Sequence, residues 1–177
     1  MPHAVFFYRD DMALIDALVA LIRAAYQERA TMIVIVIEPH RTQVHARFQS
    51  LTQSEIEATV LYIDAVDLLS TFMVNGLPDR TRFISALTPF VEWATLRGPI
   101  RIFGEMVGLL WTQGNTTGAL RLEELWTELA ARYTFSRVCN YPLSGFSDQH
   151  HENYHQVCHI HTRVLHAGQA PLITPRL

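Results

Sequence analysis

The sequence contains no lysine, since all fourteen of its basic residues are arginine. This absence excludes the phosphate-binding lysine of a P-loop, a Schiff-base lysine and a lysine general base. Glycine is also missing from everything before Gly76. The turn "YRDD" (8–11), which follows the first apolar run, therefore has no residue that lets backbone approach a pyrophosphate closely, and its two aspartates would repel one. We expect this chain not to bind nucleotide through a phosphate loop.

Long apolar runs and a secretory signal are also absent. The first apolar run is five residues long (4–8), and "MIVIVI" (32–37) is six, so neither can cross a bilayer. The formal net charge of -3 gives no electrostatic reason to expect nucleic acid or an anionic membrane as a partner. The two cysteines, Cys139 and Cys158, are expected to be free thiols. These features predict a cytoplasmic protein.

Short apolar runs alternate with longer segments of helical periodicity along the chain. The run 31–37 is unbroken and β-branched, which is typical of a strand covered on both faces. Strands separated by helices of about ten or more residues indicate βαβ units. We predict one α/β domain over residues 1–177, with three layers: a mostly parallel central sheet of about five strands and helices on both faces. The predicted strands are residues 4–8, 31–37, 59–63, 100–103 and 133–141.

The last segment, "DQHHENYHQVCHIHTRVL" (148–165), is harder to assign. Its apolar residues recur at helical spacing through Leu165, so we predict a helix, with a strand as the alternative.

Ligands of open parallel sheets bind outside the carboxyl ends of the strands. In this sequence those ends carry aromatic and sulfur-bearing side chains with a few polar groups, which suits a small organic ligand. Core packing is the alternative for the aromatic residues, and helix capping is the alternative for Asp64, which ends "VLYID" as a Walker B aspartate would. The residues assigned to this site are Tyr8, Arg9, Glu38, His40, Asp64, Glu105, Met106 and Tyr141.

Five motifs in order along the chain resemble the MEDS domain, the methanogen/methylotroph sensory domain. They are "FFY" (6–8), "RIFGEMV" (101–107), "LRLEELW" (120–126), "CNYP" (139–142) and "CHIH" (158–161), and the resemblance extends from His3 to about Leu165. The matching residues are Phe7, Tyr8, Gly104, Glu105, Met106, Glu123, Trp126, Cys139, Tyr141, Cys158 and His161.

The resemblance implies a RecA/KaiC-like fold without a P-loop, used as a sensor of small hydrocarbon-derived molecules. Members of this family are often fused to histidine kinases or DNA-binding domains. The present sequence shows no such output domain, so the expected partners are a small organic ligand and a separate histidine kinase or transcription regulator. A homodimer stays open, and neither a cofactor nor direct contact with nucleic acid or membrane is expected.

The histidines support a rival hypothesis, because six of the nine lie between His150 and His166. On a helix, His151 and His155 would share a face at the spacing of zinc ligands, and Cys158 and His161 follow. The alternative function is therefore a metal-binding sensor that uses His151, His155, Cys158 and His161. Packing on the apolar stripe, with one satisfied hydrogen bond, is the favoured explanation of Cys158 and His161, and paired structural-zinc motifs are missing from the sequence.

No motif in the sequence indicates a reaction. It has no G-x-S-x-G elbow, and a cysteine nucleophile would need an exposed thiol of lowered pKa. A residual nucleotide-binding or enzymatic protein that uses Asp64 and Glu105 is the remaining alternative. We expect a sensory module that is not an enzyme.

Overall fold

The β-branched run of the sequence forms strand β2 (Thr31–Val36), which is buried at every residue and lies inside a six-stranded sheet. The computed structural model describes residues 3–48, 58–146 and 151–166. The strand order is β3-β2-β6-β7-β1-β8, and every neighbouring pair runs parallel. The other strands are β1 (His3–Tyr8), β3 (Val60–Asp64), β6 (Ile100–Gly104), β7 (Phe135–Pro142) and β8 (Arg163–His166).

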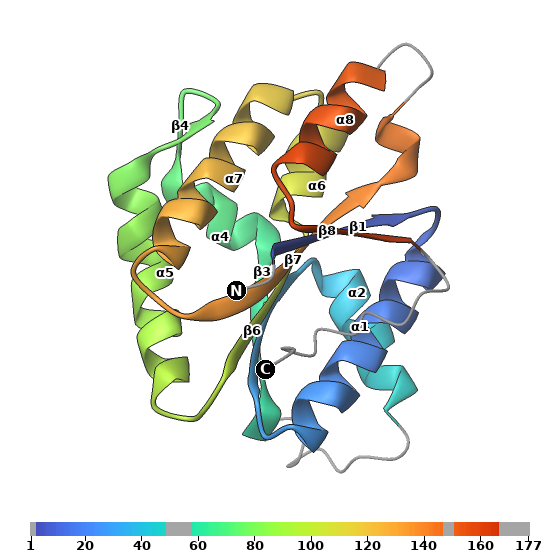
Figure 1. Ribbon diagram of the computed structural model, residues 1–177, viewed down its shortest axis with the longest axis vertical. Coiled ribbons are helices and arrows are strands. Elements are labelled where there is room, and N and C mark those ends of the chain that lie inside the picture. Colours follow the sequence, from blue (N-terminus) through green and yellow to red (C-terminus); the bar gives the residue numbers. More distant parts are fainter. Residues whose placement is uncertain (1–2, 49–57, 147–150, 167–177) are drawn as a thin grey trace.

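Helices cover both faces of this sheet, as Figure 1 shows. Helices α1 (Asp11–Gln27) and α2 (Glu38–Arg47) pack on one face, where their apolar residues form a core with Phe6, Val34 and Phe103. The opposite face carries a larger core that includes Val5, Ile33 and Cys139. The helices on that face are α4 (Ala65–Phe72), α5 (Arg80–Thr95), α6 (Met106–Thr112), α7 (Thr116–Ala130) and α8 (His151–His159). The predicted three-layer α/β architecture is confirmed.

Several of the described connections are short, and several helices begin at a capping side chain. The carboxylate of Asp79 accepts the Arg82 N–H at 2.9 Å, and the Asn115 amide oxygen accepts the Gly118 N–H at 2.9 Å. Between α4 and α5, a two-residue turn at Asn75 and Gly76, both with positive φ, closes a small hairpin. Its strands are β4 (Met73–Val74) and β5 (Leu77–Pro78), and a 3₁₀ turn spans Leu143–Gly145.

The prediction for the last segment is wrong beyond His159. Helix α8 ends there, and β8 follows as a sixth strand that pairs with β1. Thr162 directs this change, because its N–H donates to the His3 carbonyl at 2.7 Å and its hydroxyl bonds the backbone of His3. A parallel partner thus satisfies backbone groups that a continued helix would leave at the sheet edge.

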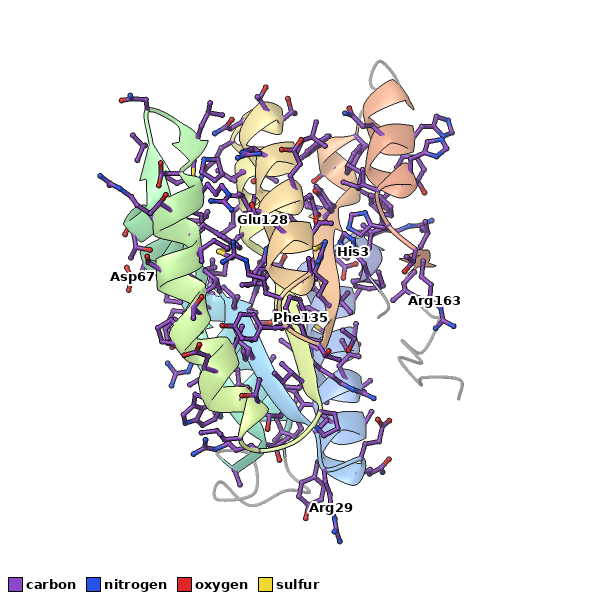
Figure 2. All side chains as sticks on the ribbon, turned by 60° about the vertical axis from the view of Figure 1, so that its left-hand side comes forward. His3, Arg29, Asp67, Glu128, Phe135 and Arg163 are labelled. Carbon is purple, nitrogen blue, oxygen red and sulfur yellow. The ribbon has the colours of Figure 1, made fainter. Side chains whose placement is uncertain are left out.

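Among the described residues, no helix combines the length and the apolar character that are needed to span a bilayer. Arg29, in the turn before β2, and Asp67, in the first turn of α4, lie at the outer surface, whereas Phe135 lies between the sheet and the helices (Figure 2).

Trp126 of α7 offers a test of how the helix layer is anchored. Its side chain is 3% exposed and packs edge-on against Phe83, with ring centroids 5.3 Å apart, and against Phe135. We expect Trp126→Ala to lower the free energy of unfolding by about 3–5 kcal/mol, because it removes a large buried aromatic ring. Leu96→Ala, at a side chain that is 85% exposed, should change it by less than about 0.5 kcal/mol. Chemical denaturation measures both, and a loss below about 1 kcal/mol for Trp126→Ala would contradict the packing described.

Candidate functional site

A cleft of about 280 Å³ lies at the carboxyl ends of four neighbouring strands. The turns that follow β1, β2, β6 and β7 meet there, because parallel strands all end at the same edge of a sheet. Tyr8 and Arg9 line it from the first turn, His40 from α2, and Glu105 from the turn before α6. Four of the eight residues assigned to a ligand site are thus brought together.

Glu105 lies at the base of this cleft and is only 3% exposed. It occupies the position before the first turn of α6, but its carboxylate does not cap that helix. One oxygen, Oε1, lies 2.7 Å from Nδ1 of His40, and the other accepts the backbone N–H of Ile37 at 3.3 Å. The side chain therefore crosses from the end of β6 to the end of β2 and holds the two turns together.

His40 continues this arrangement toward the rim. It is 5% exposed and stands in the first turn of α2, where Pro39 supplies a backbone angle suited to a helix start. Its second ring nitrogen, Nε2, lies 3.5 Å from Oδ1 of Asp11. Burial acts to lower the pKa of His40, but the hydrogen bond and charge of Glu105, with help from Asp11, raise it above its ordinary value. The two carboxylates that face the ring favour its protonated form more than water would.

Tyr8 closes β1 beside this pair. Burial raises the pKa of its phenol, and the charges of Glu105 and Asp11 raise it further. The phenol therefore stays protonated at the edge of the cleft and can donate a hydrogen bond to a bound molecule.

The turn after β1 has features that disfavour phosphate. Asp10 is the N-cap of α1, and its carboxylate accepts the Ala13 N–H at 2.9 Å. A backbone donor that would bind an anion at a helix start is thus already satisfied, and Asp11 adds a second negative charge. This turn forms one wall of the cleft instead of a phosphate cradle.

The other four assigned residues lie elsewhere. Asp64 caps α4 by accepting the N–H groups of Val66 and Asp67 at 2.8 and 2.9 Å, which is the alternative given for it. Glu38 is exposed on α2 and accepts the Thr42 hydroxyl at 3.0 Å. Met106 and Tyr141 are buried in the core beneath α6 and α7.

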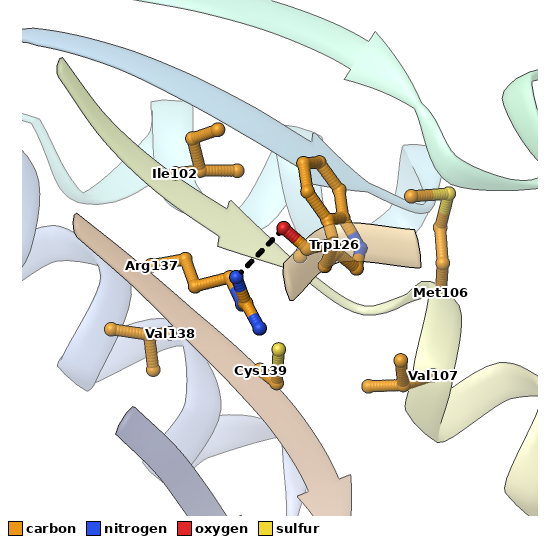
Figure 3. Close-up of a pocket in the computed structure, with 8 residues that line it drawn as sticks. Ile102, Met106, Val107, Trp126, Arg137, Val138 and Cys139 are labelled. Atoms are coloured by element: carbon orange, nitrogen blue, oxygen red, sulfur yellow. Dashed lines mark hydrogen bonds between the residues drawn. The ribbon is translucent and has the colours of Figure 1, made fainter. Parts of the chain in front are cut away.

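Met106 lines a different and much smaller hollow, which Figure 3 shows between the sheet and α7. Its volume of about 10 Å³ has room for at most about one water molecule. Arg137 and Cys139 of β7 face this hollow, and the Arg137 guanidinium donates to the Trp126 carbonyl at 3.0 Å. This hollow is too small for an organic ligand.

The histidines assigned to a metal site are not gathered as expected. His155 is exposed on α8, whereas His161 is buried beyond the end of that helix. The side chain of His151 lies outside the described residues. Within the described ranges, the metal-type donors that do converge are His3, Glu123, Cys139 and His161. Of the assigned set, only His161 belongs to this group.

Asp10 and Asp11 also line the cleft, as expected of a turn that forms one wall of a small-molecule pocket, although neither was among the eight assigned residues. Asp10 and Asp11 directly follow the predicted end of the first strand, where the strand-end rule applies to the side chains of the whole turn. Thr112 and Ser144 also line the cleft, from the end of α6 and the turn after β7, and no pattern in the sequence distinguishes them.

Comparison with known proteins gives one result. A family model described as "MEDS: MEthanogen/methylotroph, DcmR Sensory domain" matches residues 2–162 of the chain. Neither the curated proteins nor the solved structures contain a significant match.

The Glu105–His40 pair predicts a measurable titration. The ring protons of His40 in an NMR titration should report a pKa above about 6.5, and Glu105→Gln should bring it below that value, because burial then dominates. Glu38→Gln, an exposed change on the same helix, should leave the titration in place. A raised folded-state pKa stabilises the fold fully below about pH 6.5, and this contribution is lost as pH rises through the folded pKa. An unchanged titration in Glu105→Gln would contradict the pairing.

Proposed function

The chain belongs to the MEDS family of sensory domains, and from this premise we propose that it senses a small organic molecule bound in the cleft at the carboxyl ends of the strands. The observation that carries the proposal is the buried Glu105–His40 pair at the base of that cleft. Taking two charged groups out of water is costly, and such pairs are retained where they orient something. Here the pair lies below an open, partly apolar hollow.

The size and lining of the cleft indicate the class of ligand. Its volume of about 280 Å³ is at the lower end of the range for ligand pockets, about 300–1,000 Å³, so the molecule has few heavy atoms. Ile37, Leu109 and Pro142 supply apolar surface, and the Tyr8 hydroxyl can donate a hydrogen bond. A small molecule with an apolar body and one polar group fits this lining.

Charge argues against an anionic ligand. Three carboxylates, those of Asp10, Asp11 and Glu105, face the cleft against the cations of Arg9 and His40. The surplus of negative charge disfavours phosphate and carboxylate compounds. An uncharged hydrocarbon-like molecule is the ligand class that we propose.

Signalling without catalysis is the role that this geometry supports. Both ring nitrogens of His40 face carboxylates, at 2.7 and 3.5 Å, so the ring lacks the free lone pair that a general base needs. Glu105 joins the ends of β2 and β6, and a ligand that contacts it acts on two turns at once. The output is then passed to a partner, such as a histidine kinase or a transcription regulator.

A cleft-filling variant tests the ligand site. Thr112 is exposed, ends α6 and lines the cleft, so Thr112→Trp places an indole in it. Thr95 is a matched control, because it also ends a helix and its hydroxyl also bonds the carbonyl three residues earlier. We expect methanol, dichloromethane and short alcohols, tested by thermal shift, to raise the Tm of the wild type and of Thr95→Trp.

The same compounds should not raise the Tm of Thr112→Trp, because the cleft is filled. Stabilisation that persists in Thr112→Trp would place the binding elsewhere and overturn the assignment of this cleft. Stabilisation by none of the compounds would overturn the proposed ligand class.

Nucleotide binding is expected to fail in the same protein. Isothermal titration with ATP and Mg²⁺ should show no heat of binding, because the turn after β1 has no glycine and its two aspartates would repel the phosphates of a nucleotide. Micromolar affinity for ATP–Mg²⁺ would contradict this account of the turn.

A further inference from the structure

Four metal-type side chains converge inside the protein, on the face of the sheet covered by α7 and α8. His3 begins β1, Glu123 lies in α7, Cys139 lies in β7, and His161 follows α8. Their donor atoms all lie within 4.8 Å of one another. Glu123, Cys139 and His161 are 2%, 4% and 8% exposed, so this cluster is separate from the cleft and hidden from solvent.

Glu123 is the centre of the cluster. Its Oε2 lies 3.2 Å from Nε2 of His3 and 3.3 Å from Sγ of Cys139. Its Oε1 accepts the Tyr141 hydroxyl at 3.1 Å and lies 3.3 Å from Nε2 of His161. The donor groups of His3, Cys139 and Tyr141 therefore approach this carboxylate. His161 is the fourth group that faces it, and the other contacts of His161 determine which ring nitrogen is protonated.

The hydrogen bonds of His161 leave one nitrogen without a partner. Its Nδ1 lies 2.6 Å from the Val157 carbonyl, an acceptor, so Nδ1 carries the proton. In the neutral ring Nε2 is then a lone pair, and it points at a carboxylate oxygen, which is also an acceptor. Consistently, Nε2 is buried and makes no hydrogen bond. Two acceptors facing one another in a buried site are unfavourable, and either a proton on Nε2 or a metal ion between the two groups relieves this.

Several separations in the cluster are close to those of a metal site, and the whole set of donor atoms lies within 4.8 Å. In a tetrahedral zinc site with ligand bonds of about 2.0–2.3 Å, the donor atoms stand about 3.3–3.8 Å apart. Oε2 of Glu123 lies 3.2 Å from Nε2 of His3 and 3.3 Å from Sγ of Cys139, and its Oε1 lies 3.3 Å from Nε2 of His161. Sγ of Cys139 lies 3.5 Å from Nε2 of His3. The Nδ1–carbonyl bond of His161 is also the contact that orients a metal-binding imidazole.

We propose that His3, Glu123, Cys139 and His161 bind one Zn²⁺, or a divalent ion of similar softness, in a closed tetrahedral site. Two nitrogens, one sulfur and one oxygen form a donor set that zinc prefers, and a glutamate with a cysteine thiolate neutralises its two charges. The site is independent of the cleft and of the ligand proposed for it.

Binding requires three local changes that the surroundings allow. The thiol of Cys139 releases its proton to solvent, and the proton of His3 moves from Nε2 to Nδ1. Arg137 now donates to that Nδ1 at 2.9 Å, and it gives up this bond while it keeps those with the Trp126 carbonyl and the Thr127 hydroxyl. An ion can reach the site through a hollow of about 270 Å³ between α7 and α8, which Glu123 lines together with Gln156.

Cobalt titration of the metal-free, untagged full chain tests the site. The wild type should bind one equivalent of Co²⁺ and develop tetrahedral visible bands with a thiolate charge-transfer band. Cys139→Ser should lose the charge-transfer band, and His161→Gln should bind at least about tenfold more weakly, since even an outer-shell partner costs that much. Cys158→Ser and His155→Ala are the matched controls from α8, outside the cluster, and should behave as the wild type.

Two results would overturn the proposal. One is no stoichiometric metal in the wild type, and the other is a thiolate band that survives Cys139→Ser and disappears in Cys158→Ser. Circular dichroism checks that each variant folds. If Cys139→Ser does not fold, X-ray absorption of the wild-type zinc complex decides: one sulfur among four ligands supports the site, and a shell of nitrogen and oxygen alone rejects it.

Discussion

A carboxylate removed from water must be neutralised by the groups around it, and two buried glutamates impose this constraint on the molecule. Glu105 meets it with His40 and the Ile37 N–H, and so fixes the turns after β2 and β6 against each other. Glu123 receives hydrogen bonds from side chains of β1 and β7 and faces His161, which precedes β8, where we propose that a metal ion supplies the charge. Each glutamate therefore ties together segments that are distant in sequence, and each defines one of the two sites.

Most of the secondary structure could be predicted from the local hydrophobic pattern of the sequence. The exception, strand β8, shows where a local pattern is not sufficient. The runs that became β1, β2, β6 and β7 are buried because both faces of an inner strand are covered. Strand β8 lies at the edge, with only Val164 and Leu165 as apolar residues, and its apolar spacing continued that of α8. What makes it a strand is pairing with β1, about 160 residues away, which no local window contains.

The residues of the cleft and those of the buried cluster could be predicted from the sequence to different extents, for a similar reason. The rule that ligands bind at strand ends selected Tyr8, Arg9, His40 and Glu105, which line the cleft. The rule gives the edge of the sheet at which a residue lies, but not whether its side chain points into the cleft or into the core. Met106 and Tyr141 also follow or end strands, yet their side chains turn toward the core of α6 and α7, and Asp64 serves its own helix. The buried cluster drew its members from four elements, so the i, i+4 spacing of the histidines on α8 could not reveal it. Glu123, Cys139 and His161 were nevertheless among the residues that carried the family resemblance.

Strand β1 has a consequence for how the two sites relate. His3 begins it and Tyr8 ends it, so one six-residue strand reaches from the buried cluster to the cleft, a span of about 17 Å. Its flanking strands β7 and β8 pair with it along most of its length and fix its register. Any communication between the two sites along this strand is a coupling free energy, and it acts equally in both directions: occupation of either site changes the affinity of the other by the same factor.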